Sequence, residues 1–116
     1  MIYIIDDDQH VRRGFGILLK SAGFECKSYG SAEEFLEKSE PAGNDLIILD
    51  YHLPEMSGCD LLDHFLKVKL HIPVIIITAF DDQISRDCAK KYGALAYLRK
   101  PVDGEALVDL IKYSVN

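Results

Sequence analysis

The stretch LIIL at residues 46–49, together with VIIIT at residues 74–78, decides the fold. Both runs are nearly continuous and rich in isoleucine, and the run IYII at residues 2–5 has the same character. Unbroken apolar runs of this length are typical of strands that are buried on both faces, as in a parallel sheet. We therefore predict that these three segments form the centre of a parallel sheet.

Two further apolar runs complete the set of strands. Residues 24–28 alternate between apolar and polar side chains, which favours an edge strand, and residues 95–98 supply the last strand. The intervening segments have helical spacing, over about 58–68, 82–92 and 104–114 in the second half of the chain. The second helix is predicted to begin with a capping box of Ser31 and Glu34. The residues expected to face the core are Val11, Phe15, Leu18 and Leu19; Leu61, Leu62, Phe65 and Leu66; Ile84, Cys88 and Ala89; and Leu107, Leu110 and Ile111.

The alternation of strand and helix predicts an α/β fold with helices on both faces of the sheet. We expect a flavodoxin-like, doubly wound sheet of five parallel strands in the order 2-1-3-4-5, with five helices. A closed barrel would need eight strands and about twice the length. With 116 residues, the chain fits one domain over residues 1–116 and leaves no room for a second.

Composition excludes several classes of protein. Hydrophobic residues make up 48% and charged residues 28%, as in ordinary globular proteins. No apolar stretch reaches the roughly 18 residues of a membrane span, and MIYIIDDD at the start does not resemble a signal peptide. A net charge of -6 argues against direct nucleic-acid binding by this segment. We expect a cytoplasmic protein without membrane contact.

The cysteines are Cys26, Cys59 and Cys88. An odd, widely spaced set without a CxxC pair predicts reduced thiols in a cytosolic protein, packed as small core residues. Neither a disulfide framework nor a zinc site is expected.

Polar residues follow the predicted strands at their carboxyl ends. Asp6 and Asp7 follow the first strand, Asp50 follows the third, Thr78 ends the fourth and Lys100 follows the fifth. These ends meet at one edge of a parallel sheet, where ligands bind. Clustered carboxylates suit Mg²⁺, and a lysine and a hydroxyl beside them suit a phosphoryl group. Asp50 is the best nucleophile, because carboxylates can form acyl phosphates.

Simpler interpretations stay open for Asp8, Thr78 and Tyr97. Asp8 completes the acidic run and can serve as the N-cap of the following helix, so we choose the two acids nearest the strand as the metal pair. Thr78 taken alone could be an ordinary β-branched strand residue. Tyr97 could be a packing residue with its hydroxyl in water.

The whole chain resembles the receiver domain of two-component response regulators. The matching pieces are IIDDD at residues 4–8, LDYHLPEMSG at 49–58, ITA at 77–79 and YLRKP at 97–101. Each piece alone is a weak signal, but all four occur in order and each lies at a strand end. His52 and Phe80 are less usual residues near such a site.

The resemblance implies a role for each matching residue. Asp50 would be the phosphoacceptor, and Asp7, Asp6, Asp50 and the backbone carbonyl of His52 would hold Mg²⁺ or Mn²⁺, with Asp7 a direct ligand. Lys100 and Thr78 would bind the phosphoryl oxygens, and Ala79 would keep the entrance open. Tyr97 would be the switch aromatic, and the peptide bond before Pro101 would be cis.

The resemblance also implies a function: a phosphorylation-controlled signalling switch that catalyses only its own phosphorylation and dephosphorylation. The phosphoryl donor would be a sensor histidine kinase or a phosphotransfer protein. The expected output face combines the helix over 82–92, the strand over 95–98 and the helix over 104–114, and it can bind a second copy of the domain. The domain would stand alone or form the N-terminal part of a longer regulator, such as a transcriptional one.

Three other functions fit the sequence less well. An aspartate-nucleophile phosphatase usually has a second acid two residues after the nucleophile, where this chain has His52. A flavin-binding domain needs a phosphate loop after the first strand, where the acids of residues 6–8 would repel phosphate. A degenerate receiver that acts only as a scaffold would not need the complete set of acids, threonine and lysine.

Overall fold

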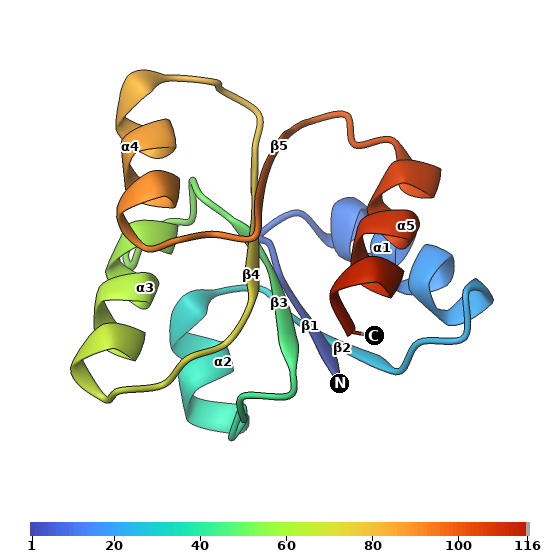
Figure 1. Ribbon diagram of the computed structural model, residues 1–116, viewed down its shortest axis with the longest axis horizontal. Helices are drawn as coiled ribbons and strands as arrows, with labels where there is room; N and C mark the ends of the chain where they lie inside the picture. Colours follow the sequence, from blue (N-terminus) through green and yellow to red (C-terminus); the bar gives the residue numbers. More distant parts are fainter. Residues whose placement is uncertain (116) are drawn as a thin grey trace.

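The computed structural model describes residues 1–115, in which strands and helices alternate from the first strand to the last helix (Figure 1). The strands are β1 Ile2–Ile5, β2 Cys26–Tyr29, β3 Leu46–Asp50, β4 Val74–Thr78 and β5 Ala96–Arg99. The helices are α1 Gln9–Ser21, α2 Ala32–Lys38, α3 Gly58–Lys67, α4 Gln83–Lys91 and α5 Gly104–Val115. The predicted α/β class is therefore confirmed.

All neighbouring strands are parallel, and their order is β2-β1-β3-β4-β5, as predicted. In register, Ile4 lies beside Ile48, and Ile48 beside Ile75. Helices α2, α3 and α4 cover one face of the sheet, and α1 and α5 cover the other (Figure 1). This doubly wound arrangement leaves the carboxyl ends of the strands at one edge, which carries the site described below.

The core consists of two apolar layers that share the sheet. Alternate residues of one strand point to opposite faces, so Ile5 and Leu49 lie in the layer under α2, α3 and α4, whereas Ile4 and Ile48 lie in the layer under α1 and α5. Every residue of β1, β3 and β4 is buried. The unbroken apolar runs of the sequence therefore indicated burial on both faces correctly.

Two of the residues expected to face the core are instead exposed. Ile84 is 72% exposed because α4 buries the face that carries Ser85, Cys88 and Ala89, and Ile84 lies about 100° around the helix from Ser85. Leu66 is 58% exposed because it lies near the end of α3, beside an open hollow that α3 forms with the loop before β4 and the segment after α4. Apolar spacing alone did not fix the rotation of α4 about its axis.

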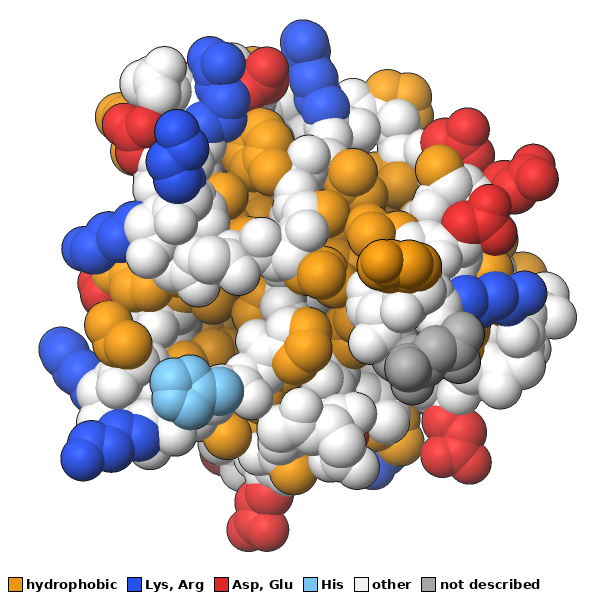
Figure 2. All heavy atoms as spheres, in the orientation of Figure 1, with side chains coloured by type: hydrophobic (Ala, Val, Ile, Leu, Met, Phe, Trp, Pro, Cys, Tyr) orange, Lys and Arg blue, Asp and Glu red, His pale blue; other side chains and the backbone are white. Residues whose placement is uncertain are grey.

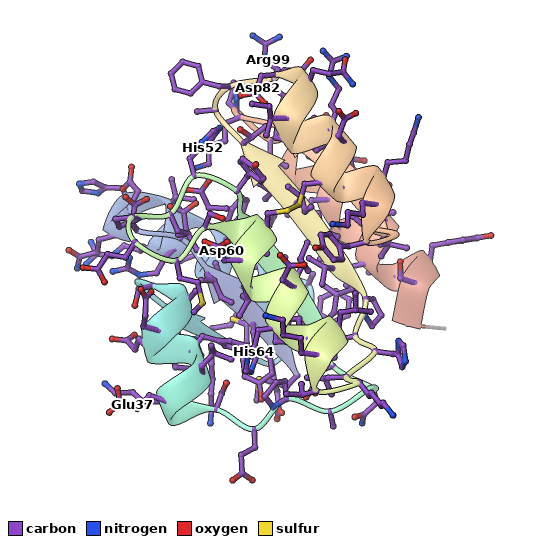
Figure 3. The ribbon with its side chains drawn as sticks, turned by 90° about the vertical axis from the view of Figure 1, so that its left-hand side faces the viewer. Glu37, His52, Asp60, His64, Asp82 and Arg99 are labelled. Carbon is purple, nitrogen blue, oxygen red and sulfur yellow. A yellow bond between two sulfur atoms is a disulfide. The ribbon has the colours of Figure 1, made fainter. Side chains whose placement is uncertain are left out.

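The prediction of reduced cysteines is wrong for two of the three. Cys59 and Cys88, 29 residues apart, form a disulfide that joins α3 to α4 (Figure 3). Their Cα atoms are 6.1 Å apart, within the range that a disulfide spans. The pairing arises because α3 and α4 pack side by side on the same face of the sheet, a proximity that chain spacing does not reveal. Cys26 is free.

Within residues 1–115, no helix combines the length and apolar character that a bilayer span requires.

Candidate functional site

Four strands deliver polar side chains to one edge of the sheet. Asp6 follows β1 directly, Asp50 is the last residue of β3 and Thr78 is the last residue of β4. Lys100 follows β5, and its backbone N–H donates to the carbonyl of Thr78 over 2.8 Å. The parallel register therefore brings together residues that are up to 94 positions apart in the chain.

Three acidic side chains form the centre of this site. One carboxylate oxygen from each of Asp6, Asp7 and Asp50 lies within 4.8 Å of the others. Asp6 and Asp50 are 2% and 5% exposed, whereas Asp7 is open to solvent. A donor set made only of carboxylate oxygens, with one open side, fits a hard divalent cation. The cluster could therefore bind a metal.

Lys100 bridges the two buried acids. Its Nζ lies 2.9 Å from Asp6 Oδ2 and 3.4 Å from Asp50 Oδ2. Burial of Lys100 disfavours its charge, yet the hydrogen bond to Asp6 and the negative charge of Asp50 outweigh this effect and raise the pKa of Lys100. The ammonium group therefore stays charged and offsets the repulsion between the carboxylates.

Asp50 is held at both carboxylate oxygens. Oδ1 accepts the backbone N–H of His52 over 3.1 Å, and Oδ2 lies against Lys100. Burial and the nearby charge of Asp6 raise the pKa of Asp50, and Lys100 and the His52 N–H only partly oppose this rise. The site thus orients a carboxylate whose charge it does not fully neutralise, which favours the approach of a cation.

Asp6 and Asp8 have different structural roles. The Oδ1 atom of Asp6 accepts the backbone N–H of Asp8 over 2.9 Å, so both oxygens of Asp6 have partners. Asp8 is the N-cap of α1, and its side chain accepts the backbone N–H of His10 over 2.8 Å. Arg12 Nη1 donates to the backbone carbonyl of Asp6 over 2.7 Å and fixes the end of β1. Sequence reasoning missed this contribution from Arg12.

The hydroxyl of Thr78 serves the loop after β4. It is fully buried, donates to the carbonyl of Phe80 over 2.8 Å and accepts the N–H of Phe80 over 3.1 Å. Ala79 and Phe80 themselves are exposed. Thr78 therefore lies at the edge where the acids meet, with its hydroxyl hydrogen-bonded within its own loop.

Tyr97 faces α4. Its ring is half-buried against the core layer beneath α4, and its hydroxyl lies 2.6 Å from Ser85 Oγ and 3.2 Å from Asp81 Oδ1. The hydroxyl is therefore bonded to the loop after β4 and to α4, whereas the packing alternative placed it in water. Sequence reasoning missed Ser85, because nothing in its spacing indicates contact with a strand 12 residues later.

The two remaining predicted residues lie at the same end of the molecule. His52 is exposed, its ring lies 5.9 Å from that of Phe80, and Figure 3 places it near Asp82 at the start of α4. The Lys100–Pro101 peptide bond is cis.

Comparisons with known proteins agree with this geometry. Residues 2–112 match the family model of the response regulator receiver domain. Nodulation protein W of Bradyrhizobium diazoefficiens is 33% identical over 111 residues, 96% of this chain and 49% of that protein. Transcriptional regulatory protein FixJ of Rhizobium meliloti is 32% identical, over 96% of this chain and 54% of that protein. The chain spans about half the length of these curated relatives.

A solved structure supports the same relationship. The response regulator StyR superposes with a TM-score of 0.89 at 37% identity, over 98% of this chain and 58% of that one.

Proposed function

This chain belongs to the response regulator receiver domain family, and from that membership we propose that Asp50 is its phosphoacceptor. The family is one of signalling domains, and receiver domains of response regulators interact with histidine kinases. One observation carries the assignment to Asp50: Lys100 Nζ contacts both Asp6 and Asp50 where three carboxylates converge. Such a site holds the nucleophile, a fixed positive charge and a cation-binding group together.

The proposed reaction is phosphoryl transfer from a phosphohistidine. The bond between phosphorus and the imidazole nitrogen breaks as a bond to an Asp50 carboxylate oxygen forms, and the imidazole leaves with the electron pair. Lys100 is placed to hold charge on the phosphoryl oxygens. Asp6, Asp7, Asp50 and the backbone carbonyl of His52 would hold Mg²⁺ or Mn²⁺, which when bound neutralises phosphoryl charge.

The phosphorylated state would alter the face made of α4, β5 and α5. Thr78 would donate its hydroxyl to the phosphoryl group, which requires it to give up the carbonyl of Phe80 as acceptor. Ala79 has a small side chain that leaves the approach to Asp50 open. Because Tyr97 is bonded to Ser85 and Asp81, a movement of this loop would also change the contacts of Tyr97. Phosphorylation would thus bias a two-state element.

The partners follow from this scheme. The donor would be a sensor histidine kinase or a phosphotransfer protein. The α4–β5–α5 face would also bind a second copy of the domain: Figure 2 shows Lys and Arg side chains over α4 and Asp and Glu side chains over α5, on either side of apolar side chains. Lys90 and Lys91 end α4 and Glu105 begins α5, so a two-fold pairing could place opposite charges together.

The setting of the domain is also a proposal. Residues 1–116 would form one receiver domain in the cytoplasm, with no membrane contact and no direct nucleic-acid binding. It would catalyse only its own phosphorylation and dephosphorylation. A place in a transcriptional regulator is supported by the name of the relative FixJ.

Beryllofluoride, a mimic of the phosphoryl group, tests the proposed site. We expect the NMR signals of the backbone amides around Asp50 to shift when beryllofluoride and Mg²⁺ are added together. Asp7→Asn should require at least about tenfold more Mg²⁺, because it removes one ligand charge. Asp8→Ala is the matched control: it should lose about 1 kcal/mol of stability as an N-cap while keeping the Mg²⁺ requirement of the wild type. If the amide signals of the wild type do not change when both reagents are added, the proposal is contradicted.

A further inference from the structure

The disulfide between Cys59 and Cys88 ties α4 to α3 at the side of α4 that faces the sheet. Cys88 follows Ser85 by one turn, and both are buried. Ser85 contacts Tyr97, so the sulfur bridge and the tyrosine contact restrain the same face of the helix. The hydroxyl of Tyr92 donates to Asp63 of α3 at the other end of α4. Position and orientation of α4 therefore depend on α3.

The start of α3, which carries Cys59, packs against the candidate site. Gly58, the residue before Cys59, donates its N–H to the carbonyl of Tyr51 over 3.0 Å. A Cβ at Gly58 would lie 3.0 Å from the Cα of Tyr51 and 3.2 Å from the carbonyl oxygen of Asp50. The start of α3 thus packs directly on the backbone that follows the proposed phosphoacceptor. A bond from Cys59 to α4 fixes α4 relative to that backbone.

Both cysteines lie where free thiols would also be packed among apolar side chains. Cys88 is 4% exposed and belongs to the core layer under α4, and Cys59 is half-buried against the same layer. As thiols, both would pack as small apolar side chains. Both cysteines lie in or against the core layer under α2, α3 and α4, so the oxidised and reduced forms can share one fold. Cys59 is accessible enough at the first turn of α3 to meet a small thiol reagent.

We propose that Cys59 and Cys88 form a reversible redox lock that holds α4 against α3. A low-molecular-weight disulfide of the glutathione class is the oxidant. The Cys59 thiolate attacks one of its sulfurs, forming a mixed disulfide and releasing one thiol; the Cys88 thiolate then attacks the Cys59 sulfur and releases the second. Two protein thiols are oxidised and one small disulfide is reduced to two thiols. A dithiol reverses the reaction.

The consequence rests on the proposed phosphoacceptor function. In the reduced form α4 can shift relative to α3 when the loop after β4 and Tyr97 rearrange. In the oxidised form α4 stays in place, so phosphoryl binding at Asp50 is uncoupled from the α4–β5–α5 face. In reducing compartments disulfides are usually transient or redox-sensing, which agrees with a regulatory bond rather than a permanent one.

The first test counts thiols. Cys26→Ser removes the free cysteine, the first residue of β2, whose side chain lies against α1 and away from α3 and α4. After treatment with oxidised glutathione and then N-ethylmaleimide, intact mass should show no alkylation, and after dithiothreitol it should show two adducts. Two adducts in both samples, or a lasting glutathione adduct, would overturn the lock.

The second test records the NMR signals of the backbone amides of α4 in the same Cys26→Ser variant. With Mg²⁺ and beryllofluoride, the reduced form should show changes around Asp50 and along α4, whereas the oxidised form should show only those around Asp50. Adding Cys59→Ser should make α4 respond under both conditions. Equal responses of α4 in the oxidised and reduced forms would overturn the proposal.

A third measurement separates the lock from the proposed function. Without beryllofluoride, amide hydrogen exchange along α4 should be at least about tenfold slower in the oxidised form than in the reduced form, because the cross-link opposes local opening. If beryllofluoride binds neither form, the phosphoacceptor proposal fails, while the exchange rates still show whether the disulfide restrains α4. Equal exchange rates would refute it.

Discussion

Lys100 allows two acids to be buried side by side. Asp6 and Asp50 are almost fully buried, and the ammonium group contacts one oxygen of each. Buried charges are tolerated only when they are paired and hydrogen-bonded. In the absence of a cation the lysine is therefore the group that keeps the acidic site compatible with the fold.

Removing this lysine should cost stability. We expect Lys100→Ala to lower the free energy of unfolding by about 2 kcal/mol without divalent cations, because two carboxylates lose their shared partner. Urea denaturation in a chelator measures the loss, and added Mg²⁺ should recover part of it. Lys112→Ala, an exposed lysine on α5, is the control and should stay within about 0.5 kcal/mol of the wild type. Equal losses in the two variants would refute the role of Lys100.

The raised pKa of Asp50 gives a pH dependence with a defined sign. An acid whose pKa is raised on folding lowers stability fully above its folded pKa, and this cost is lost as the pH falls from the folded pKa toward the unfolded value of 3.8. Asp50→Asn should therefore be more stable than the wild type at neutral pH without divalent cations. The difference should shrink toward pH 3.8. Urea denaturation across this range checks the trend, which a constant difference would contradict.

At the level of elements, sequence patterns predicted the central strands well and the edges less well. β1 and β4 have the bounds that their apolar runs indicated, because burial on both faces leaves no polar residue inside. β2 begins two residues later than predicted, at Cys26, since this half-exposed edge strand lacks a sharp pattern. The acids, Thr78 and Lys100 could be placed at one edge from topology alone. The Cys59–Cys88 bond and the Tyr97–Ser85 contact could not, because they depend on how α4 is rotated and packed.

The contact between α4 and β5 depends on Ser85. This serine is fully buried, and its hydroxyl lies against both Tyr97 and Asp82. Ser85→Ala leaves the Tyr97 hydroxyl without this partner and should lower the free energy of unfolding by about 1 kcal/mol. Hydrogen exchange along α4 should become faster at the same time. Ser28→Ala, at an exposed residue of β2, serves as the control; if it accelerates exchange in α4 equally, the assigned role of Ser85 is wrong.

At the scale of the molecule, one topological fact explains the site. Parallel strands in the order β2-β1-β3-β4-β5 bring the ends of β1, β3, β4 and β5 to a single edge, which is where doubly wound sheets bind ligands. Helices on both faces cover the two core layers, and the side chains of Asp6, Asp50 and Lys100 converge at this edge. The loop after β4 leads from this edge to α4, so it connects the site of the buried Asp50 with the outer α4–β5–α5 face.

The central claim is that Asp50 accepts a phosphoryl group with the help of a divalent cation. The most direct measurement is intact mass after incubation with acetyl phosphate and Mg²⁺, with Asp50→Asn treated in parallel. We predict one phosphoryl adduct on the wild type, none after chelation of Mg²⁺, and none on Asp50→Asn. An unmodified wild type, or an equal adduct on Asp50→Asn, would contradict the assignment of Asp50.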